Sequence, residues 1–179
     1  MIYVFLADGF EEVEALCPID LLRRAGADVR LVGVTGRMVE GAHGIRMETD
    51  LSADEMVLDR SLEMIVLPGG MPGTANLDAS AAVNDAIRFA AERGITIGAI
   101  CAAPMVLGKR GYLSGRTAVC YPGFEKYLTG ANISAKSVVA DENFITAKGM
   151  GVAHLFGLEL VGAMFGEDAV EELKQSTMM

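Results

Sequence analysis

The 179-residue sequence predicts an α/β fold, a doubly wound sandwich with a mostly parallel sheet and helices on both faces. Short apolar runs rich in β-branched residues alternate with segments of helical periodicity over most of the chain. Glycine-containing turns follow several of these runs. With 179 residues, 51% of them hydrophobic, the chain is long enough for one core and short for two, so we expect one domain over residues 1–179.

The predicted elements follow one another in a regular order. Strands are expected at residues 2–7, 28–33, 63–67, 95–100, 117–121, 138–140 and 144–147, and helices at 11–24, 79–93, 102–110, 124–128, 152–165 and 167–174. The first helix has Arg23 and Arg24 in its last turn and Gly26 after it, as helix C-termini prefer. Residues 34–50 contain three glycines and predict a hairpin or an excursion from the sheet.

The second half of the chain continues the alternation. Residues 79–93 carry apolar side chains at helical spacing and are closed by Gly94. Residues 95–100 are almost wholly apolar, which is typical of a central parallel strand. The two strands at 138–140 and 144–147 are expected to pair across a short turn, and the helix at 152–165 follows them.

Composition excludes several function classes. The net charge is −9 with no basic cluster to offset it, so neither nucleic acid nor an anionic membrane surface is an expected partner. No apolar run reaches the roughly 20 residues of a membrane span, and the start of the chain lacks a signal peptide's basic segment, so we expect a cytoplasmic protein. Cys17, Cys101 and Cys120 form no C-x-x-C pair, which argues against a disulfide framework and a zinc site.

Cys101 is the first candidate for chemistry. The predicted strand at 95–100 runs directly into the helical segment 102–110, with Cys101 at the corner and Pro104 in the first helical turn. Unpaired N–H groups at a helix N-terminus favour an anion, so the thiol pKa is expected to fall from about 8.5 to roughly 3.5 to 7.5. The alternative is structural, because a buried cysteine is commonly a small hydrophobic side chain.

Two further strand ends carry candidate groups. Glu14 lies four residues before Pro18, whose ring crowds the Glu14 carbonyl and is expected to distort the helix there. The strand at 63–67 ends in a loop with Gly69 and Gly70, whose N–H groups would be open to an oxyanion. Open α/β sheets bind ligands at the carboxyl ends of their strands, so all these groups are expected at one edge of the sheet.

The remaining polar candidates have simpler explanations. Glu11 and Glu12 in a first helical turn are expected to be solvated partners of the helix dipole. His43 in the predicted hairpin is either a solvated loop residue or part of the site lining, and His154 is expected to be packed or partly exposed on an apolar helix. The glycine-rich loop fits neither G-x-G-x-x-G nor a P-loop, so it is weak evidence for a nucleotide.

Three motifs occur in a specific order and spacing: Ala-Asp-Gly-Phe-Glu-Glu-Val-Glu at residues 7–14, Val-Leu-Pro-Gly-Gly at 66–70, and Ala-Ile-Cys-Ala-Ala-Pro at 99–104. In these motifs, and over nearly the whole chain, the sequence resembles the ThiJ/PfpI superfamily, specifically the branch of the parkinsonism-associated protein DJ-one. The resemblance implies a flavodoxin-like sandwich and a homodimer whose interface lies near the reactive cysteine. It also implies glyoxalase and deglycase activities that need no cofactor, redox sensing in oxidative stress, and chaperone activity.

The same resemblance implies roles for single residues. Cys101 would be the nucleophile, and Glu14 would be a protonated carboxylic acid hydrogen-bonded to its thiolate. Gly69, Gly70 and the backbone N–H of Ala102 would form the oxyanion site.

Two departures from the family pattern bear on mechanism. The protease-like branch has histidine directly after the nucleophile, where this chain has Ala102, so peptidase activity is not expected. The DJ-one branch commonly has histidine where this chain has Tyr121, whose hydroxyl can still donate a hydrogen bond. Tyr121 is therefore a candidate substrate-binding side chain, and His43 of the predicted hairpin is the other.

Two hypotheses follow. In the first, Cys101 attacks a small dicarbonyl such as methylglyoxal to form a hemithioacetal, and Glu14 moves the proton that isomerises it to a hydroxy acid. In the second, the protein is a non-catalytic redox sensor or chaperone that is switched by oxidation of Cys101 to the sulfinic acid. Both hypotheses need the same reactive thiol, so the sequence does not separate them.

Overall fold

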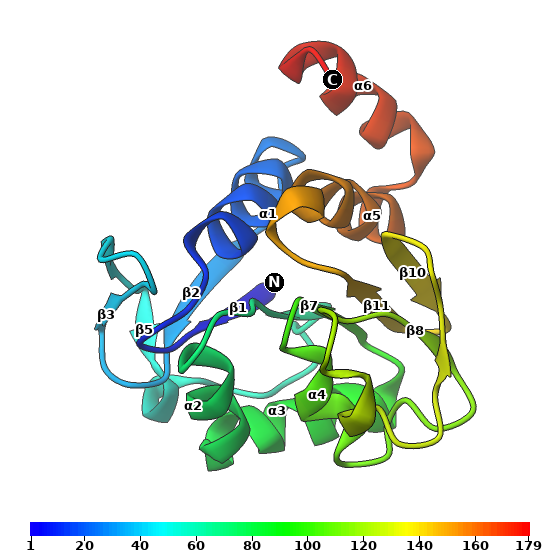
Figure 1. Ribbon diagram of the computed structural model, residues 1–179. Helices are drawn as coiled ribbons and strands as arrows, with labels where there is room; N and C mark the ends of the chain where they lie inside the picture. The colour runs from blue at the N-terminus through cyan, green and yellow to red at the C-terminus, as the bar shows by residue number, and fades with distance from the viewer.

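The computed structural model describes residues 1–179 and has a central sheet of seven strands in the order β10-β11-β7-β6-β1-β2-β5 (Figure 1). The strands are β1 (Ile2–Leu6), β2 (Val29–Gly33), β5 (Leu51–Ser52), β6 (Met64–Leu67), β7 (Thr96–Ile100), β10 (Val138–Asp141) and β11 (Phe144–Ala147). All neighbouring strands are parallel except β10, which is antiparallel to β11. The predicted mostly parallel α/β sheet is confirmed.

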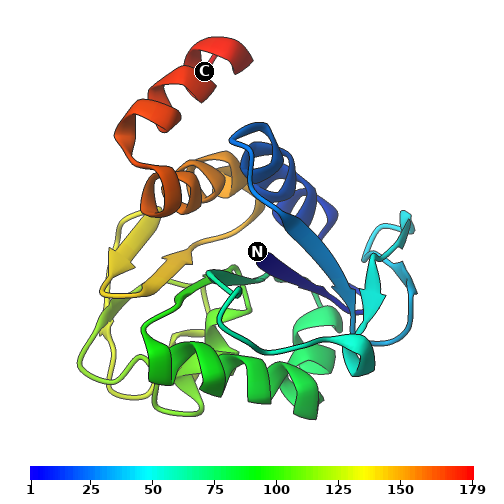
Figure 2. The ribbon, with the colours of Figure 1, turned by 180° about the vertical axis from the view of Figure 1, so that it is seen from behind.

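Helices cover both faces of this sheet (Figures 1 and 2). One face carries α1 (Glu12–Arg24) and α5 (Ala153–Phe165), and the other carries α2 (Gly73–Ala79), α3 (Ala81–Arg93) and α4 (Pro104–Gly108). The C-terminal α6 (Glu167–Thr177) packs on α5 and extends beyond it. Three short 3₁₀ helices span Ala53–Glu55, Glu125–Tyr127 and Met150–Val152. None of the helices combines the length and apolar character that crossing a bilayer requires.

The core consists of two layers, one on each side of the sheet, because successive side chains of a strand point to opposite faces. Val4 belongs to the layer that contains Leu22 of α1 and Phe156 of α5. Phe5, the next residue of β1, belongs to the layer that contains Ile87 of α3. The strands therefore bury both faces, which explains their nearly continuous apolar sequences.

The predicted excursion at residues 34–50 is an antiparallel hairpin of β3 (Met38–Glu40) and β4 (Arg46–Glu48), separate from the central sheet. Two elements differ from the prediction. Helix α2 was not predicted, because Gly73, Thr74 and Asn76 have low helix propensity and only tertiary packing holds them in a helix. The expected strand at 117–121 shortens to β8 (Thr117–Ala118), which pairs only with β9 (Asn132–Ile133) in a separate two-stranded sheet.

The parallel register brings three loops to one edge of the sheet. The carboxyl ends of β1, β6 and β7 are neighbours, and they lead into residues 7–11, 68–72 and Cys101. Backbone hydrogen bonds tie the first two loops together, since the N–H of Glu11 donates to the carbonyl of Gly69 over 2.9 Å. The candidate groups therefore meet as predicted at this edge.

The close packing of α1 on α5 depends on the absence of a side chain at Gly157. A Cβ at Gly157 of α5 would lie 2.7 Å from Leu21 Cδ1 and 3.1 Å from Pro18 Cα, both on α1. Gly157→Val should lower the free energy of unfolding by about 1 to 3 kcal/mol, because overpacking forces the two helices apart. Gly151→Val is the control, since a Cβ there meets no atom within 4 Å. Equal urea midpoints for the two variants would contradict the prediction.

Candidate active site

Cys101 occupies a strained turn directly after β7. Its φ of +65° is in the left-handed region, which costs a residue with a side chain roughly 1 to 2 kcal/mol. Backbone hydrogen bonds hold this conformation, since the N–H of Cys101 donates to the Ala147 carbonyl (2.9 Å) and the N–H of Tyr121 donates to the Cys101 carbonyl (2.8 Å). Strain of this kind persists only where the surroundings hold the backbone, and it is concentrated at functional sites.

Glu14 lies in the first turn of α1 and is almost completely buried, with 1% of its surface exposed. The carboxyl group is hydrogen-bonded to the Cys101 thiol. It also accepts the N–H of Gly69 over 3.0 Å and the N–H of Met150. A buried carboxyl needs such partners, because burial of an unpaired polar group costs several kcal/mol.

Gly69 allows the carboxyl and the thiol to approach each other. A Cβ at this position would lie 2.5 Å from the Cys101 Cβ and 2.5 Å from the Glu14 Oε2. Its N–H is used by Glu14, which contradicts the predicted role of this N–H in an oxyanion site. Gly70 and Ala102 instead direct their N–H groups to the Cys101 sulfur. Gly69 therefore acts at the site through its missing side chain and its contact with Glu14.

The two groups perturb each other's protonation. Burial raises the pKa of Glu14 to about 7, against the lowering effect of the hydrogen bonds from Cys101 and Gly69. Burial, followed by the charge of Glu14, raises the pKa of the Cys101 thiol to about 12, while the N–H groups of Gly70 and Ala102 lower it. The pair thus loses a first proton near neutral pH and resists losing a second.

The predicted fall in the thiol pKa is therefore wrong for the protein with Glu14 ionised. The prediction assumed that a helix begins at residue 102, but α4 begins at Pro104 and has only five residues. Its dipole is correspondingly short, and the nearest charged group to the thiol is the Glu14 carboxylate. The thiolate is favoured only when Glu14 holds the shared proton.

A cavity of about 440 Å³ opens onto the pair. Its lining residues are Glu11, Glu14, Cys101, Tyr121, Pro122, Lys148, Gly149, Met150, Gly151 and Val152. Tyr121 is half exposed in this wall, so the structure brings this candidate to the thiol. Lys148 and Met150 were not predicted, because they lie on the loop after β11, whose position depends on the sheet order.

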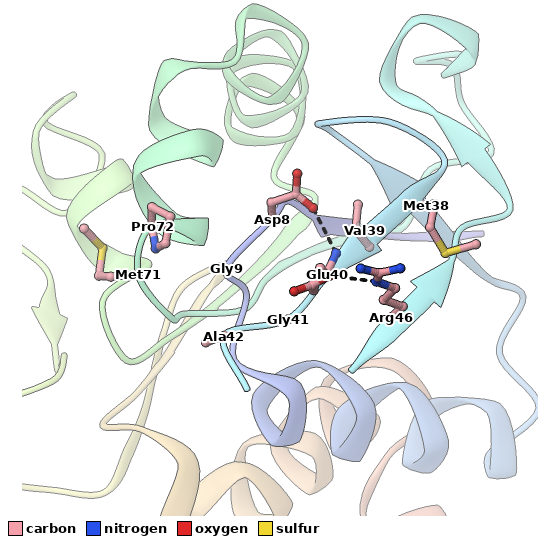
Figure 3. Close-up of a pocket in the computed structure, with 10 residues that line it drawn as sticks. All are labelled: Asp8, Gly9, Met38, Val39, Glu40, Gly41, Ala42, Arg46, Met71 and Pro72. Atoms are coloured by element: carbon pink, nitrogen blue, oxygen red, sulfur yellow. Dashed lines mark hydrogen bonds and ion pairs between the residues drawn. The ribbon is translucent and has the colours of Figure 1, made fainter. Parts of the chain in front are cut away.

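A larger cavity of about 580 Å³ lies between the end of β1, the β3–β4 hairpin and the loop after β6 (Figure 3). The charged side chains that line it are already hydrogen-bonded to protein groups. The Asp8 carboxylate accepts the N–H of Glu40 (2.9 Å), and the Glu40 carboxylate accepts from Arg46 Nε (2.7 Å). No thiol or histidine lines it. The smaller cavity, which contains Cys101, is therefore the candidate active site.

His43 does not line the Cys101 cavity, so the structure does not place this predicted substrate-binding residue at the thiol. Its Nδ1 lies 2.8 Å from Glu12 Oε2 and 3.5 Å from Glu11 Oε2. These are the only three side chains of metal-ligating type whose ligand atoms lie within 4.8 Å of one another. Hydrogen bonding and charge account for their approach, and we assign no metal to them. Glu12 is buried and Glu11 partly buried, so the prediction that both are solvated is wrong.

A doubly wound sheet with a cysteine at a strained strand end and a buried carboxyl on its thiol defines a class of α/β protein with a nucleophile-type elbow. The chain belongs to the DJ-1/PfpI family, whose model matches residues 1–163.

Individual relatives extend over nearly the same length. Protein dj-1beta of Drosophila melanogaster is 35% identical, with 98% of this chain and 95% of the relative covered. Its crystal structure has a TM-score of 0.94 with this chain at 34% identity, covering 99% of this chain and 97% of that one. The glutathione-independent glyoxalase DJR-1.2 of Caenorhabditis elegans is 30% identical (91% and 87% covered), and a deglycase of Pyrococcus abyssi is 29% identical (89% and 96% covered).

The raised pKa of Glu14 should make the free energy of unfolding depend on pH. The folded protein binds more protons than the unfolded chain between pH 4.5 and about 7, so stability should fall as the pH rises through this window. A shift of this size corresponds to roughly 2 to 4 kcal/mol. Glu14→Gln should lack this loss, whereas the exposed Glu159→Gln should retain it. Urea unfolding at pH 5 and pH 8 measures the difference, and parallel pH profiles for the parent and Glu14→Gln would contradict the prediction.

Proposed function

We propose that this protein is a cysteine-dependent enzyme that acts on small reactive carbonyls without a cofactor, in the manner of a glyoxalase or deglycase. The observation that carries the proposal is the hydrogen bond between a buried carboxyl of near-neutral pKa and a thiol that faces an open cavity. A general acid-base works best when its pKa lies near the operating pH. Relatives named as a glyoxalase and a deglycase support the same reaction class.

The first step is attack on the aldehyde carbon of methylglyoxal. The Glu14 carboxylate takes the thiol proton as the Cys101 sulfur forms its bond to carbon, and the carbonyl π electrons move to oxygen. The N–H groups of Gly70 and Ala102, which are directed to the sulfur, would donate to this oxygen. Glu14 then returns the proton to the oxygen, and the product is a hemithioacetal.

The second step moves hydrogen between the two carbons of the bound substrate. The Glu14 carboxylate removes the proton from the carbon attached to sulfur, and the electron pair forms an enediol with the adjacent carbonyl. Glu14 delivers the proton to the second carbon, while the hydroxyl proton crosses to the neighbouring oxygen. The resulting thioester is cleaved by water, which releases lactate and restores the thiol.

Glu14 has two effects that substitution separates. Glu14→Gln removes the proton shuttle, so lactate formation from methylglyoxal should fall by about 10² to 10⁴-fold. The same substitution removes the charge that opposes the thiolate, so iodoacetamide should label Cys101 at pH 8 at least as fast as in the parent. Cys101→Ser should abolish both, and the control Cys17→Ser should retain turnover.

Turnover of Glu14→Gln at close to the parent rate would show that another group is the shuttle. If the parent forms no lactate while Cys101 oxidises readily, the redox-sensor hypothesis is favoured. The N–H groups of Gly70 and Ala102 and the Glu14 acid would then hold sulfinate oxygens.

We also propose a homodimer formed through the surface beside the site. Val13 and Leu16 of α1 and Leu155 of α5 are exposed apolar side chains on two helices that pack together, and Met150 of the cavity wall is exposed with them. Exposed apolar groups of this size mark interaction surfaces when they are clustered.

The dimer prediction is specific to this surface. Leu16→Arg should reduce the mass in light scattering toward the 18.9 kDa of one chain, because it places a charge in the apolar contact. Ile133→Arg on β9 is the matched control, since Ile133 is similarly exposed on a different sheet. A parent mass of one chain at micromolar concentration would overturn the proposal.

A further inference from the structure

Charged side chains lie between the β3–β4 hairpin and the cavity that contains the Cys101–Glu14 pair. His43 donates its backbone N–H to Glu12 Oε1 over 2.7 Å, and its Nδ1 lies 2.8 Å from Glu12 Oε2. The same Nδ1 lies 3.5 Å from Glu11 Oε2. The imidazole therefore contacts two carboxylates at the start of α1, the N-cap Glu11 and Glu12, and comes from a segment 31 residues from Glu12 in the chain.

Glu12 anchors the hairpin on the helix. It is buried, and it also accepts the N–H of Ile45. Gly41 lies so close that a Cβ there would be 2.3 Å from Glu12 Oε1. Burial alone would raise the pKa of Glu12, but the hydrogen bonds from His43 and Ile45 outweigh it and lower the pKa. His43 is thus held in a defined position over the start of α1.

Glu11 connects this contact to the site. Its side chain is 17% exposed, and it lines the Cys101 cavity together with Glu14. The negative charge of Glu11 raises the pKa of Glu14. The contact with Glu12, and then the charges of Glu11 and Glu12, raise the pKa of His43. The imidazole therefore keeps its proton to a higher pH than an unperturbed histidine does.

We propose that His43 is a positioning residue for the Cys101–Glu14 pair, in which the imidazolium holds Glu11 and offsets the charge that Glu11 presents to Glu14. This inference rests on the proposed function for its role in turnover, but its effect on the thiol is independent of turnover. His43 acts on the protonation of the pair through Glu11 and makes no contact with the substrate cavity.

The other polar groups of the cavity wall make no hydrogen bond or ion pair with His43, whose partners are Glu11 and Glu12. Lys148 stands in the cavity wall on the loop after β11, and its Nζ donates to the Ala135 carbonyl over 2.7 Å. Tyr121 lies beside it in the same wall. On the hairpin itself, Glu40 and Arg46 are paired with each other at 2.7 Å. Glu11 is therefore the charged group through which His43 reaches the pair.

The sign of the effect follows from Coulomb's law. Loss of the imidazolium exposes the pair to the whole charge of Glu11, so the first proton of the pair should leave at higher pH. Loss of the Glu11 charge should have the opposite effect. Glu11 also holds the imidazolium and raises the pKa of His43, so once Glu11 is neutral the substitution of His43 should have a smaller effect on the pair.

The experiment measures the rate at which iodoacetamide labels Cys101 between about pH 5 and pH 9, by peptide mapping, at low ionic strength and with a chelator in every buffer. His43→Gln should raise the midpoint of the pH profile by about half a pH unit, a typical size for a charge that acts across a partly solvated gap. Glu11→Gln should lower it, and in the Glu11→Gln background His43→Gln should raise the midpoint by less than it does in the parent. About 1 M salt should reduce the His43→Gln shift, because the Debye length falls to about 3 Å.

Two further variants separate charge from structure. His43→Arg keeps the cation and should restore a midpoint close to that of the parent, whereas a purely structural role of the imidazole would leave it shifted. His154→Gln removes the only other histidine, which is exposed on α5, and should leave the midpoint unchanged.

An unshifted midpoint in His43→Gln, a shift of the same size in the Glu11→Gln background, or an equal shift in His154→Gln would overturn the inference. Absence of lactate from the parent, with the midpoint shifts present, would instead overturn the proposed function and leave the effect of His43 on the pair intact.

Discussion

The hydrogen bond between Glu14 and the Cys101 thiol is the interaction on which the site depends. A carboxyl that is 1% exposed is costly unless its oxygens are satisfied, and here Gly69 and Met150 supply N–H donors beside the thiol. Two acidic groups in contact inside a protein share a proton over a wide pH range, since a second negative charge is strongly opposed. The site thus holds one shared proton next to the sulfur, as the proposed carbonyl addition and isomerisation require.

Three parallel strands supply the rigid frame for that contact. The order β7-β6-β1 places the ends of three separate segments side by side, so that the thiol, Gly69 and the start of α1 meet without a long connecting loop. The left-handed turn at Cys101 and the bare Cα of Gly69 are the local adaptations that bring sulfur and carboxyl together. Both cost conformational free energy of the backbone, and the packing and hydrogen bonds of the sheet offset that cost.

Further charged side chains surround the Cys101–Glu14 pair at the start of α1. Three carboxylates lie at the start of α1, with Glu11 at the N-cap and Glu12 and Glu14 in the first turn. Each has a different environment: Glu14 faces the thiol, Glu12 binds the hairpin, and Glu11 lies between the hairpin and the cavity. In a chain of net charge −9 with two histidines, one imidazole lies among these carboxylates, and its contact with Glu12 and the charges of Glu11 and Glu12 raise its pKa. The hairpin contributes no strand to the central sheet, and this contact attaches it to the start of α1.

The sequence by itself determined the alternation of strands and helices, the excursion at 34–50, and the elbow at Cys101, because hydrophobic periodicity and glycine or proline positions are local signals. It also indicated Glu14 and the Gly69–Gly70 loop, since both follow strands. Only the tertiary structure decided that the N–H of Gly69 serves Glu14, that α4 begins at Pro104, and that Glu11, Glu12 and His43 form one cluster. These features depend on which segments meet across the fold, and no periodicity within a segment indicates the partner that a side chain acquires 31 or 55 residues away.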